Sequence, residues 1–348
     1  MSPLILSILL ISLGLGTTLT FASSHWLVAW MGLEINTLAI IPLIAQHHHP
    51  RATEASTKYF ITQAAAAALI LFASFINAWI TSQWNINFEL QPFPATLLTL
   101  ALGLKLGIAP IHFWLPEVIQ GLDFTTGLII STWQKLAPFS LLCQIIPSNP
   151  YVVSFLAISS IILGGWGGLN QTQLRKILAY SSIAHLGWIT LVVQFNQQLA
   201  LLALFIYIPI TLTAFIIFKT MITPSMNSLA SSWTKFPILT SLAPLALLSL
   251  GGLPPLTGFI PKWLIIQELT KQNIPLIATI AALGALLSLY FYLRVSYALT
   301  LTTSPNTLTS IPSWRFNTFI NFLPLATSIS ITLLILPLSP LILSTLPS

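Results

Sequence analysis

Residues Gly103 to Glu117 read GLKLGIAPIHFWLPE, an apolar run with two prolines and a lysine inside it. Each proline lacks a backbone N–H and clashes with the carbonyl four residues earlier, so a helix through this run is predicted to break. Residues Gly251 to Trp263 read GGLPPLTGFIPKW and predict a second break. Because an unsatisfied carbonyl in lipid is costly, we expect both breaks to lie where protein or water can satisfy the backbone.

The rest of the chain has the composition of a membrane protein. Of 348 residues, 55% are hydrophobic and 5% are charged, whereas soluble domains carry roughly 25% charged residues. Apolar runs of about 20 residues recur along the chain, each long enough to cross ~30 Å of hydrocarbon. The net charge of +6 comes from scattered lysines and arginines that form no basic stripe, so no nucleic-acid partner is expected.

Polar and proline-rich interruptions divide the chain into about eleven predicted transmembrane helices. The first run lacks a basic region and a cleavage motif, so we interpret it as a retained helix. We therefore predict an all-α polytopic protein with a single membrane domain over residues 1–348. The predicted helices are 3–21, 25–45, 56–80, 96–120, 124–145, 151–169, 174–195, 199–221, 238–270, 274–299 and 320–345.

The two broken runs are the fourth and ninth predicted helices, which indicates an internal repeat. Residues 1–145 and 151–299 are then two five-helix units, followed by an extra helix at 320–345. Units with an odd number of helices enter the membrane from opposite faces, which is the inverted-repeat architecture of ion-coupled transporters. The matched position of the breaks, with a lysine on each broken helix, is the basis of this prediction.

Positive charges predict the orientation in the membrane. Most cations fall in loops on one face, which the positive-inside tendency assigns to the matrix or cytoplasmic side. The N-terminus is then on that side and the C-terminus is on the opposite side. Glu117 is expected on the inner face, either as a collector of protons or as a solvated carboxylate. The inner-face cations are Arg51, Lys58, Arg175, Lys176, Lys219, Lys235, Arg294 and Arg315.

Four ionisable side chains are predicted deep in the membrane: Glu34, Lys105, Lys135 and Lys262. Glu34 lies about nine residues from either polar boundary, or roughly 14 Å at 1.5 Å per residue. Each such group costs at least ~2.5 kcal/mol at mid-depth. Buried Glu–Lys pairs that only join helices are one interpretation. Three lysines for one deep carboxylate favour proton exchange instead, because burial of a static pair adds little stability.

Lysine suits proton exchange, because burial favours the neutral amine whereas a nearby carboxylate favours the ammonium. Movement of Glu34 toward or away from Lys105 would therefore load or release a proton. His112 and His185 are candidate relays through neutral imidazole, or else core histidines that fill polar gaps. Other candidates are hydroxyls, which could line a path or bond their own helix backbone: Thr132, Tyr180, Ser181 and Ser182.

No metal or redox cofactor is predicted in this chain. Cys143 is the single cysteine, which leaves no thiolate set for an iron–sulfur cluster or a disulfide. The run His47-His48-His49 could suggest a metal site. Consecutive residues do not face one another, however, so we prefer a loop at the membrane surface.

Five motifs resemble the subunit 2 family of vertebrate mitochondrial NADH dehydrogenase, and the resemblance covers essentially the whole chain. It implies an antiporter-like, proton-translocating subunit of respiratory complex I in the mitochondrial inner membrane. NADH, FMN, iron–sulfur clusters and ubiquinone would be bound by other subunits, where the electron transfer occurs. The motifs are WMGLEIN at 30–36, GLKLGIAPIHFWLPE at 103–117, TWQKLAP at 132–138, GGWGGLNQT at 164–172 and GGLPPLTGFIPKW at 251–263.

The same resemblance implies roles for the deep residues. Glu34 and Lys105 would form a modulating pair, Lys135 would be the central relay, and Lys262 would lie on the outlet side. Expected partners are neighbouring membrane-arm subunits and a lipid such as cardiolipin. Two other functions fit these residues: a stand-alone cation/proton antiporter, and a structural or assembly subunit whose charges only fix helix register. The absence of a midplane aspartate pair argues mildly against the antiporter.

Overall fold

The computed structural model describes residues 2–46, 49–86, 90–145, 150–234, 236–301, 322–334 and 336–340. These residues are mostly helical and form no β-strand, as the sequence predicts. Seven of the helices within these ranges are long and apolar enough to cross a membrane, and shorter apolar helices accompany them. The total of about eleven spans stays a prediction. His47, His48, Lys235 and Arg315 lie outside the described residues.

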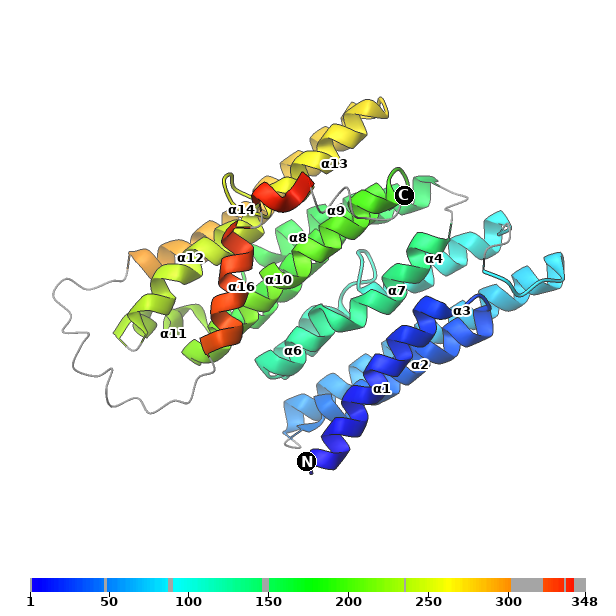
Figure 1. The fold of residues 1–348 in the computed structure, drawn as a ribbon, viewed down its shortest axis with the longest axis horizontal. Helices are drawn as coiled ribbons and strands as arrows, with labels where there is room; N and C mark the ends of the chain where they lie inside the picture. The colour runs from blue at the N-terminus through cyan, green and yellow to red at the C-terminus, as the bar shows by residue number, and fades with distance from the viewer. Residues whose placement is uncertain are drawn as a thin grey trace. The chain divides into compact units, whose positions relative to one another are not determined.

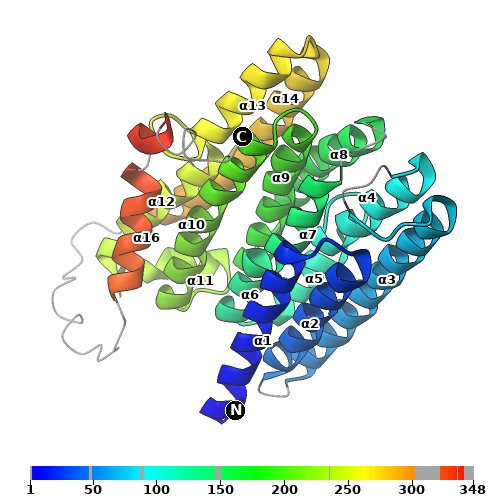
Figure 2. The same cartoon turned by 45° about the vertical axis from the view of Figure 1, so that its right-hand side comes forward.

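The chain forms two compact units, Met1–Ser160 and Ile161–Ser348. In the first unit, α2 packs against both α1 and α3, as Figures 1 and 2 show. Helix α7 packs against α1, α2 and α4, and α3 packs against α4 and α5. The helices of this unit are α1 (Pro3–Ala22), α2 (Trp26–Ile44), α3 (Pro50–Thr81), α4 (Pro92–Leu106), α5 (Trp114–Gly121), α6 (Phe124–Ser131), α7 (Trp133–Gln144) and the first part of α8 (Pro150–Gly168).

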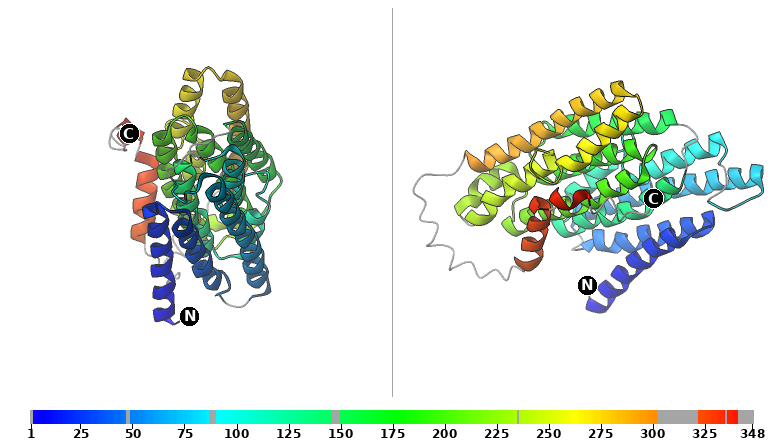
Figure 3. Two further views of the ribbon diagram at one scale, coloured as in Figure 1. Left: turned by 90° about the vertical axis from the view of Figure 1, so that its right-hand side faces the viewer. Right: turned by 45° about the horizontal axis from the view of Figure 1, so that its top comes forward.

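In the second unit, α10 packs against α9, α12, α13 and α16. The red helix α16 lies beside the green α10 in Figures 1 and 3. This unit contains the rest of α8 and α9 (Leu174–Val193), α10 (Gln197–Met221), α11 (Met226–Ala230), η2 (Ser231–Thr234), α12 (Pro237–Gly251), α13 (Phe259–Lys271), α14 (Pro275–Thr300), α16 (Phe322–Leu334) and η3 (Leu336–Leu338).

Two glycines bring α1 and α2 into close contact. A Cβ built on Gly16 would lie 2.9 Å from the Gly32 carbonyl oxygen, and a Cβ on Gly32 would lie 2.9 Å from the Gly16 carbonyl oxygen. A Cβ on Gly16 would also collide with the side chain of Asn36. Small residues at this crossing therefore let the two backbones approach, as is common between membrane helices.

The broken helix of the first unit ends in a glycine cap, which confirms the predicted break. Helix α4 stops one residue before Gly107, and α5 begins at Trp114. Gly107 has φ 78°, in the left-handed region that favours glycine. Its N–H donates to the Leu104 carbonyl at 3.1 Å, and the Ile108 N–H donates to the Gly103 carbonyl at 2.9 Å. These paired bonds form a Schellman motif, which satisfies the carbonyls freed by the break.

The second unit repeats this cap with the same spacing. Helix α12 stops one residue before Gly252, and α13 begins seven residues after it at Phe259, the interval found in the first unit. Gly252 has φ 76°. Its N–H and that of the next residue donate to the carbonyls of Ser249 and Leu248, at 3.0 and 3.3 Å. Both predicted breaks are therefore present and are closed by the same backbone geometry.

The matched caps show that the two lysines occupy different places. Lys105 lies two residues before Gly107, whereas Lys262 lies ten residues after Gly252. The residue ten positions after Gly107 is Glu117. Each broken helix does carry a lysine, as predicted, but the lysines belong to opposite halves of their helices.

The fifth predicted helix, 124–145, contains an interruption that the sequence did not predict. It is divided into α6 and α7 at Thr132, which has φ −117° and ψ −69°. The Thr132 hydroxyl donates to the Leu128 carbonyl at 2.7 Å. This interruption places Lys135 in the first turn of α7.

Candidate functional site

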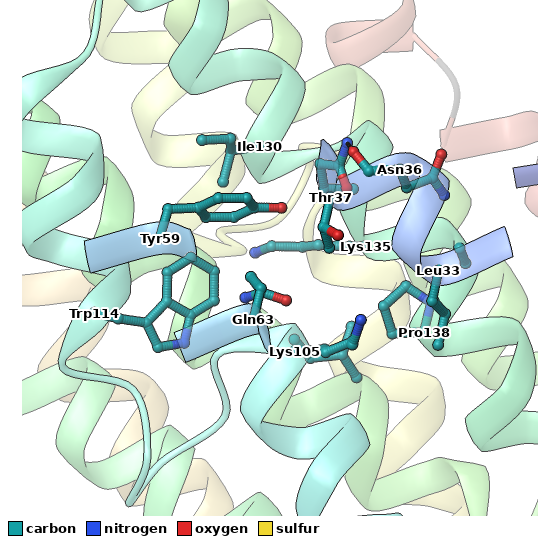
Figure 4. Close-up of a pocket in the computed structure, with 13 residues that line it drawn as sticks. Leu33, Asn36, Thr37, Tyr59, Gln63, Lys105, Trp114, Ile130, Lys135 and Pro138 are labelled. Atoms are coloured by element: carbon teal, nitrogen blue, oxygen red, sulfur yellow. Dashed lines mark hydrogen bonds between the residues drawn. The ribbon is translucent and has the colours of Figure 1, made fainter. Parts of the chain in front are cut away.

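A small cavity inside the first unit is lined by Lys105 and Lys135, two of the four ionisable residues that the sequence predicts deep in the membrane. Its volume is about 10 Å³, near the ~10–15 Å³ that one water molecule needs. Lys105 reaches it from α4 and Lys135 reaches it from α7 (Figure 4). The other polar residues that line it are Asn36, Thr37, Tyr59, Gln63, Trp114 and Gln134.

Lys105 is deeply buried, with 5% of its surface exposed. Its ammonium nitrogen has no hydrogen-bond partner among the described residues. A buried charge without a partner is costly. The amine is therefore either neutral or hydrogen-bonded to a small polar molecule in the cavity. Both states are typical of an amine that exchanges protons.

Glu34 lies on α2, the helix that also carries the cavity residues Asn36 and Thr37. Its side chain is half-buried in the middle of that helix. The Thr37 hydroxyl lies 3.0 Å from Glu34 Oε2 and donates to the Glu34 carbonyl at 2.9 Å. Neither Glu34 nor Lys105 belongs to an ion pair in the described part of the chain. The modulating pair of Glu34 and Lys105 therefore stays a prediction.

Lys135 is 3% exposed and enters the same cavity from the neighbouring helix. The adjacent Gln134 ties α7 to α2, since its Nε2 donates to the Asn36 carbonyl at 3.5 Å. The sequence predicted both lysines as deep residues. It did not predict that they share a cavity, because that depends on how α4 and α7 pack.

Lys262 has a direct partner in the second unit. Its ammonium nitrogen donates to the Gly251 carbonyl at 2.7 Å, and its side chain is buried. Gly251 is the last residue of α12, where the helix dipole places partial negative charge. At the first break the indole of Trp114 has the related role, donating to the Leu104 carbonyl at 3.0 Å. Lys262 therefore caps the broken helix.

The two predicted histidines do not line the cavity. His112 is 4% exposed within the first break, with Nδ1 3.3 Å from the Pro110 carbonyl and its ring stacked on Phe113 at 4.5 Å. His185 is half-buried on α9, and its ring centre lies 5.5 Å from that of Tyr207. Their role as relays stays a prediction.

Most of the predicted hydroxyls bond their own helix. Ser181 donates to the Leu178 carbonyl at 2.7 Å, and Ser182 donates to the Ala179 carbonyl at 2.8 Å. Tyr207, which the sequence analysis did not single out, is buried and hydrogen-bonds with Ser182. A tyrosine in an apolar helix gives little sequence signal, because it also occurs as an ordinary core residue.

The cavity contains polar residues that the sequence analysis missed. Gln63 and Asn36 are 3% and 2% exposed. The Gln63 Nε2 and both side-chain polar atoms of Asn36 have no hydrogen-bond partner among the described residues. The available signal was an amide inside an apolar run, as in ITQAAAAALILF at 61–72. Such amides are expensive to bury unpaired.

Outside the cavity, Lys58 joins α3 to α5. Its ammonium lies 2.7 Å from carboxylates of both Glu54 and Glu117. All three side chains are exposed, at 41%, 62% and 52% for Lys58, Glu54 and Glu117. Glu117 is thus a paired surface carboxylate, on the same side of the unit as Lys58, and its part in proton collection stays a prediction.

Comparison with known proteins gives family matches over nearly the whole chain. Residues 23–288 match the family described as NADH:quinone oxidoreductase/Mrp antiporter, transmembrane region. Residues 289–343 match the NADH dehydrogenase subunit 2 C-terminus. A protein named NADH-ubiquinone oxidoreductase chain 2 from Gadus morhua is 71% identical over 340 residues, covering 98% of each chain. Its counterpart from Tetraodon nigroviridis is 63% identical over 344 residues, covering 99% of each.

Solved structures with the same fold include a chain of respiratory complex I from Thermus thermophilus with bound aureothin. The TM-score is 0.87 at 28% identity, and the match covers 98% of this chain and 79% of that chain. A chain of the Mrp complex from Dietzia sp. DQ12-45-1b matches with a TM-score of 0.75 at 16% identity, covering 86% of this chain and 61% of that chain. The second likeness concerns the fold alone.

Proposed function

Since this chain belongs to the NADH-ubiquinone oxidoreductase chain 2 family, we propose that Lys105, Lys135 and Lys262 pass protons across the membrane under the control of Glu34. The chain is an antiporter-like membrane-arm subunit of respiratory complex I, an H⁺-translocating NADH:ubiquinone oxidoreductase, and its partners are other subunits of that complex. Its vertebrate relatives imply a mitochondrial location.

The observation that supports the proposal most is the shared cavity of Lys105 and Lys135. Two amines at one enclosed polar space can exchange a proton through a single bridging water, since each can hold or release it. The Lys105 nitrogen, which has no hydrogen-bond partner in the described ranges, supports this assignment.

Glu34 acts as the control group in this proposal. It lies on α2, which lines the cavity with Asn36 and Thr37, and it forms no ion pair with Lys105. A displacement of α2 would therefore change the proton affinity of the amine without breaking an ion pair. Lys262 acts on the outlet side. Its ammonium donates to the Gly251 carbonyl, and the neutral amine left after proton release still has N–H groups that can donate to it, so the cap of α12 can persist through the release step.

We also propose the number of transmembrane helices, their repeat arrangement, their orientation in the membrane and the partners of the chain. The chain has about eleven transmembrane helices in two inverted repeats, and the matching caps at Gly107 and Gly252 support this arrangement. We place it in the inner membrane with its N-terminus on the matrix side, as the positive charges suggest. Neighbouring membrane-arm subunits and a lipid such as cardiolipin contact its exposed apolar helices. NADH, FMN, iron–sulfur clusters and ubiquinone belong to other subunits.

Substitution of the lysines in assembled complex I tests the proposal. Lys105→Met and Lys135→Met remove the exchangeable proton while keeping an unbranched apolar chain, and we expect coupled turnover to fall at least about tenfold. The matched control is Lys271→Met, because Lys271 is 62% exposed at the end of α13. NADH oxidation and proton uptake are measured together. Unchanged turnover and proton-to-electron ratio in both buried variants would contradict the proposal.

A further inference from the structure

Gln63 is a buried amide that neither the family resemblance nor the lysine scheme uses. It lies on α3, is 3% exposed and lines the cavity of Lys105 and Lys135. In Figure 4 its carboxamide lies between the side chains of those two lysines. Its Nε2 has no acceptor among the described residues. An amide left unpaired in a membrane interior is costly, so the cavity must supply an acceptor.

The cavity has the size and the partners for one water molecule. Its volume of about 10 Å³ is close to that of a single-water site, and such a water requires 2–4 polar partners, roughly. Within the part of the chain that the structure describes, Gln63 Nε2 and the Lys105 ammonium are both donors without an acceptor. A water oxygen accepts from both, which leaves its own hydrogens free to bond toward Lys135.

The other polar residues that line the cavity are less suited to hold a water molecule between the two lysines. The side chain of Asn36 is wedged against Gly16 of α1, where a Cβ would collide with it. The ring of Tyr59 packs edge-on against Trp114, with ring centres 5.8 Å apart. Gln134 donates to the Asn36 carbonyl. Asn36 Nδ2 also lacks a partner among the described residues, but Gln63 is the amide whose side chain lies between those of the two lysines (Figure 4).

We propose that Gln63 positions a water between Lys105 and Lys135 and thereby sets the rate of proton transfer between them. This inference rests on the proposed function. In the step, the Lys105 ammonium gives one proton to the water oxygen while the same water gives one of its own protons to the neutral Lys135 amine. Lys105 becomes neutral, Lys135 becomes an ammonium, and the water is regenerated. Gln63 is a positioning residue, since it exchanges no proton.

The test compares Gln63→Met with Gln63→His in assembled complex I. Methionine has a similar length but offers no N–H donor, so we expect turnover to fall about fivefold, the equivalent of one lost hydrogen bond. Histidine keeps a donor and an acceptor and should restore at least half of the rate. The solvent isotope effect in D₂O should rise in Gln63→Met, because the proton step becomes limiting. A merely structural role would not change that isotope effect.

The matched control is Gln144→Leu, which removes an amide from the far end of α7. Gln144 is half-buried, its Oε1 has no hydrogen-bond partner among the residues described, and it does not line the cavity. We expect wild-type turnover and isotope effect from it. If Gln63→Met behaves like this control while Lys105→Met is impaired, the water inference is wrong and the proposed function stands. If Lys105→Met is also unimpaired, both are wrong.

A second measurement decides the question if Gln63→Met fails to assemble. An experimental density map of the wild-type complex, at a resolution that shows waters, should contain one within hydrogen-bond distance of both Gln63 Nε2 and Lys105 Nζ. A direct contact of Gln63 with another side chain, with no water between the lysines, would overturn the inference.

Discussion

Lys262 donates a 2.7 Å hydrogen bond to the carbonyl of Gly251, the residue that ends α12. One side chain therefore holds a broken helix together and is also the proposed proton carrier on the outlet side. The two roles can be separated, because arginine keeps the charge and the donors of lysine but does not lose its proton in proteins.

We predict that Lys262→Arg and Lys262→Met fail for different reasons. Lys262→Met leaves the Gly251 carbonyl without its donor, and its stability should fall by ~1–3 kcal/mol. Lys262→Arg should lose turnover while the complex melts near the wild-type temperature. Thermal unfolding and NADH-driven proton uptake measure the two effects. Wild-type turnover in Lys262→Arg would show that Lys262 is only a cap.

Glu34 should act through its charge rather than through contact. Since it has no ion pair with Lys105, Glu34→Asp should keep most of the turnover even though its carboxylate is shorter. Glu34→Gln keeps the shape and removes the charge, and its turnover should fall severalfold. Initial rates of NADH oxidation by membranes test this. Equal losses in both variants would indicate that the length of the side chain matters instead.

Gly252 should not tolerate a side chain. It has φ 76°, and a Cβ would lie 2.9 Å from Lys262 Cδ and 3.1 Å from the Gly258 carbonyl oxygen. We expect Gly252→Ala to destabilise the protein by at least ~1 kcal/mol, because alanine is strained in the left-handed region. The control is Gly14→Ala, where a Cβ meets nothing within 4 Å. Native-gel abundance and melting temperature compare the two, and equal stability would contradict the prediction.

The crossing of α1 and α2 should depend on Gly32. A Cβ there would meet Thr20 Cγ2 at 2.7 Å and the Gly16 carbonyl at 2.9 Å. We expect Gly32→Leu to separate the helices and to reduce assembly, since close backbone contact stabilises membrane helix pairs. Gly14→Leu points into open space on the same helix pair. It should assemble normally, and a similar defect in both variants would point to a different cause.

Sequence patterns predicted the features that single residues determine. Prolines that accompany glycines located both helix breaks, whereas the single prolines inside α2, α7, α10 and α12 leave those helices continuous. Glu34 and the three lysines were predicted as deep residues because a charged side chain inside an apolar run is rare and costly wherever the run lies. The interruption at Thr132 was missed, since threonine carries no comparable local constraint.

The arrangement of the site could not be read from the sequence. The shared cavity of Lys105 and Lys135 depends on the packing of α4 against α7, which involves side chains distant in the chain. Gln63 was missed because one amide before a run of alanines has no motif. Its significance comes from an unpaired donor beside two lysines, and only packing places it there.

The equal spacing of the two glycine caps also provides a register for building chimaeras. Segments exchanged between the halves should be superposed on Gly107 and Gly252, which share their backbone geometry. Superposition on the lysines would displace one segment by more than three turns. When the segments are superposed on the two glycines, Glu117 coincides with Lys262. An exchanged segment would therefore place a negative charge where the original segment has a positive one, or the reverse.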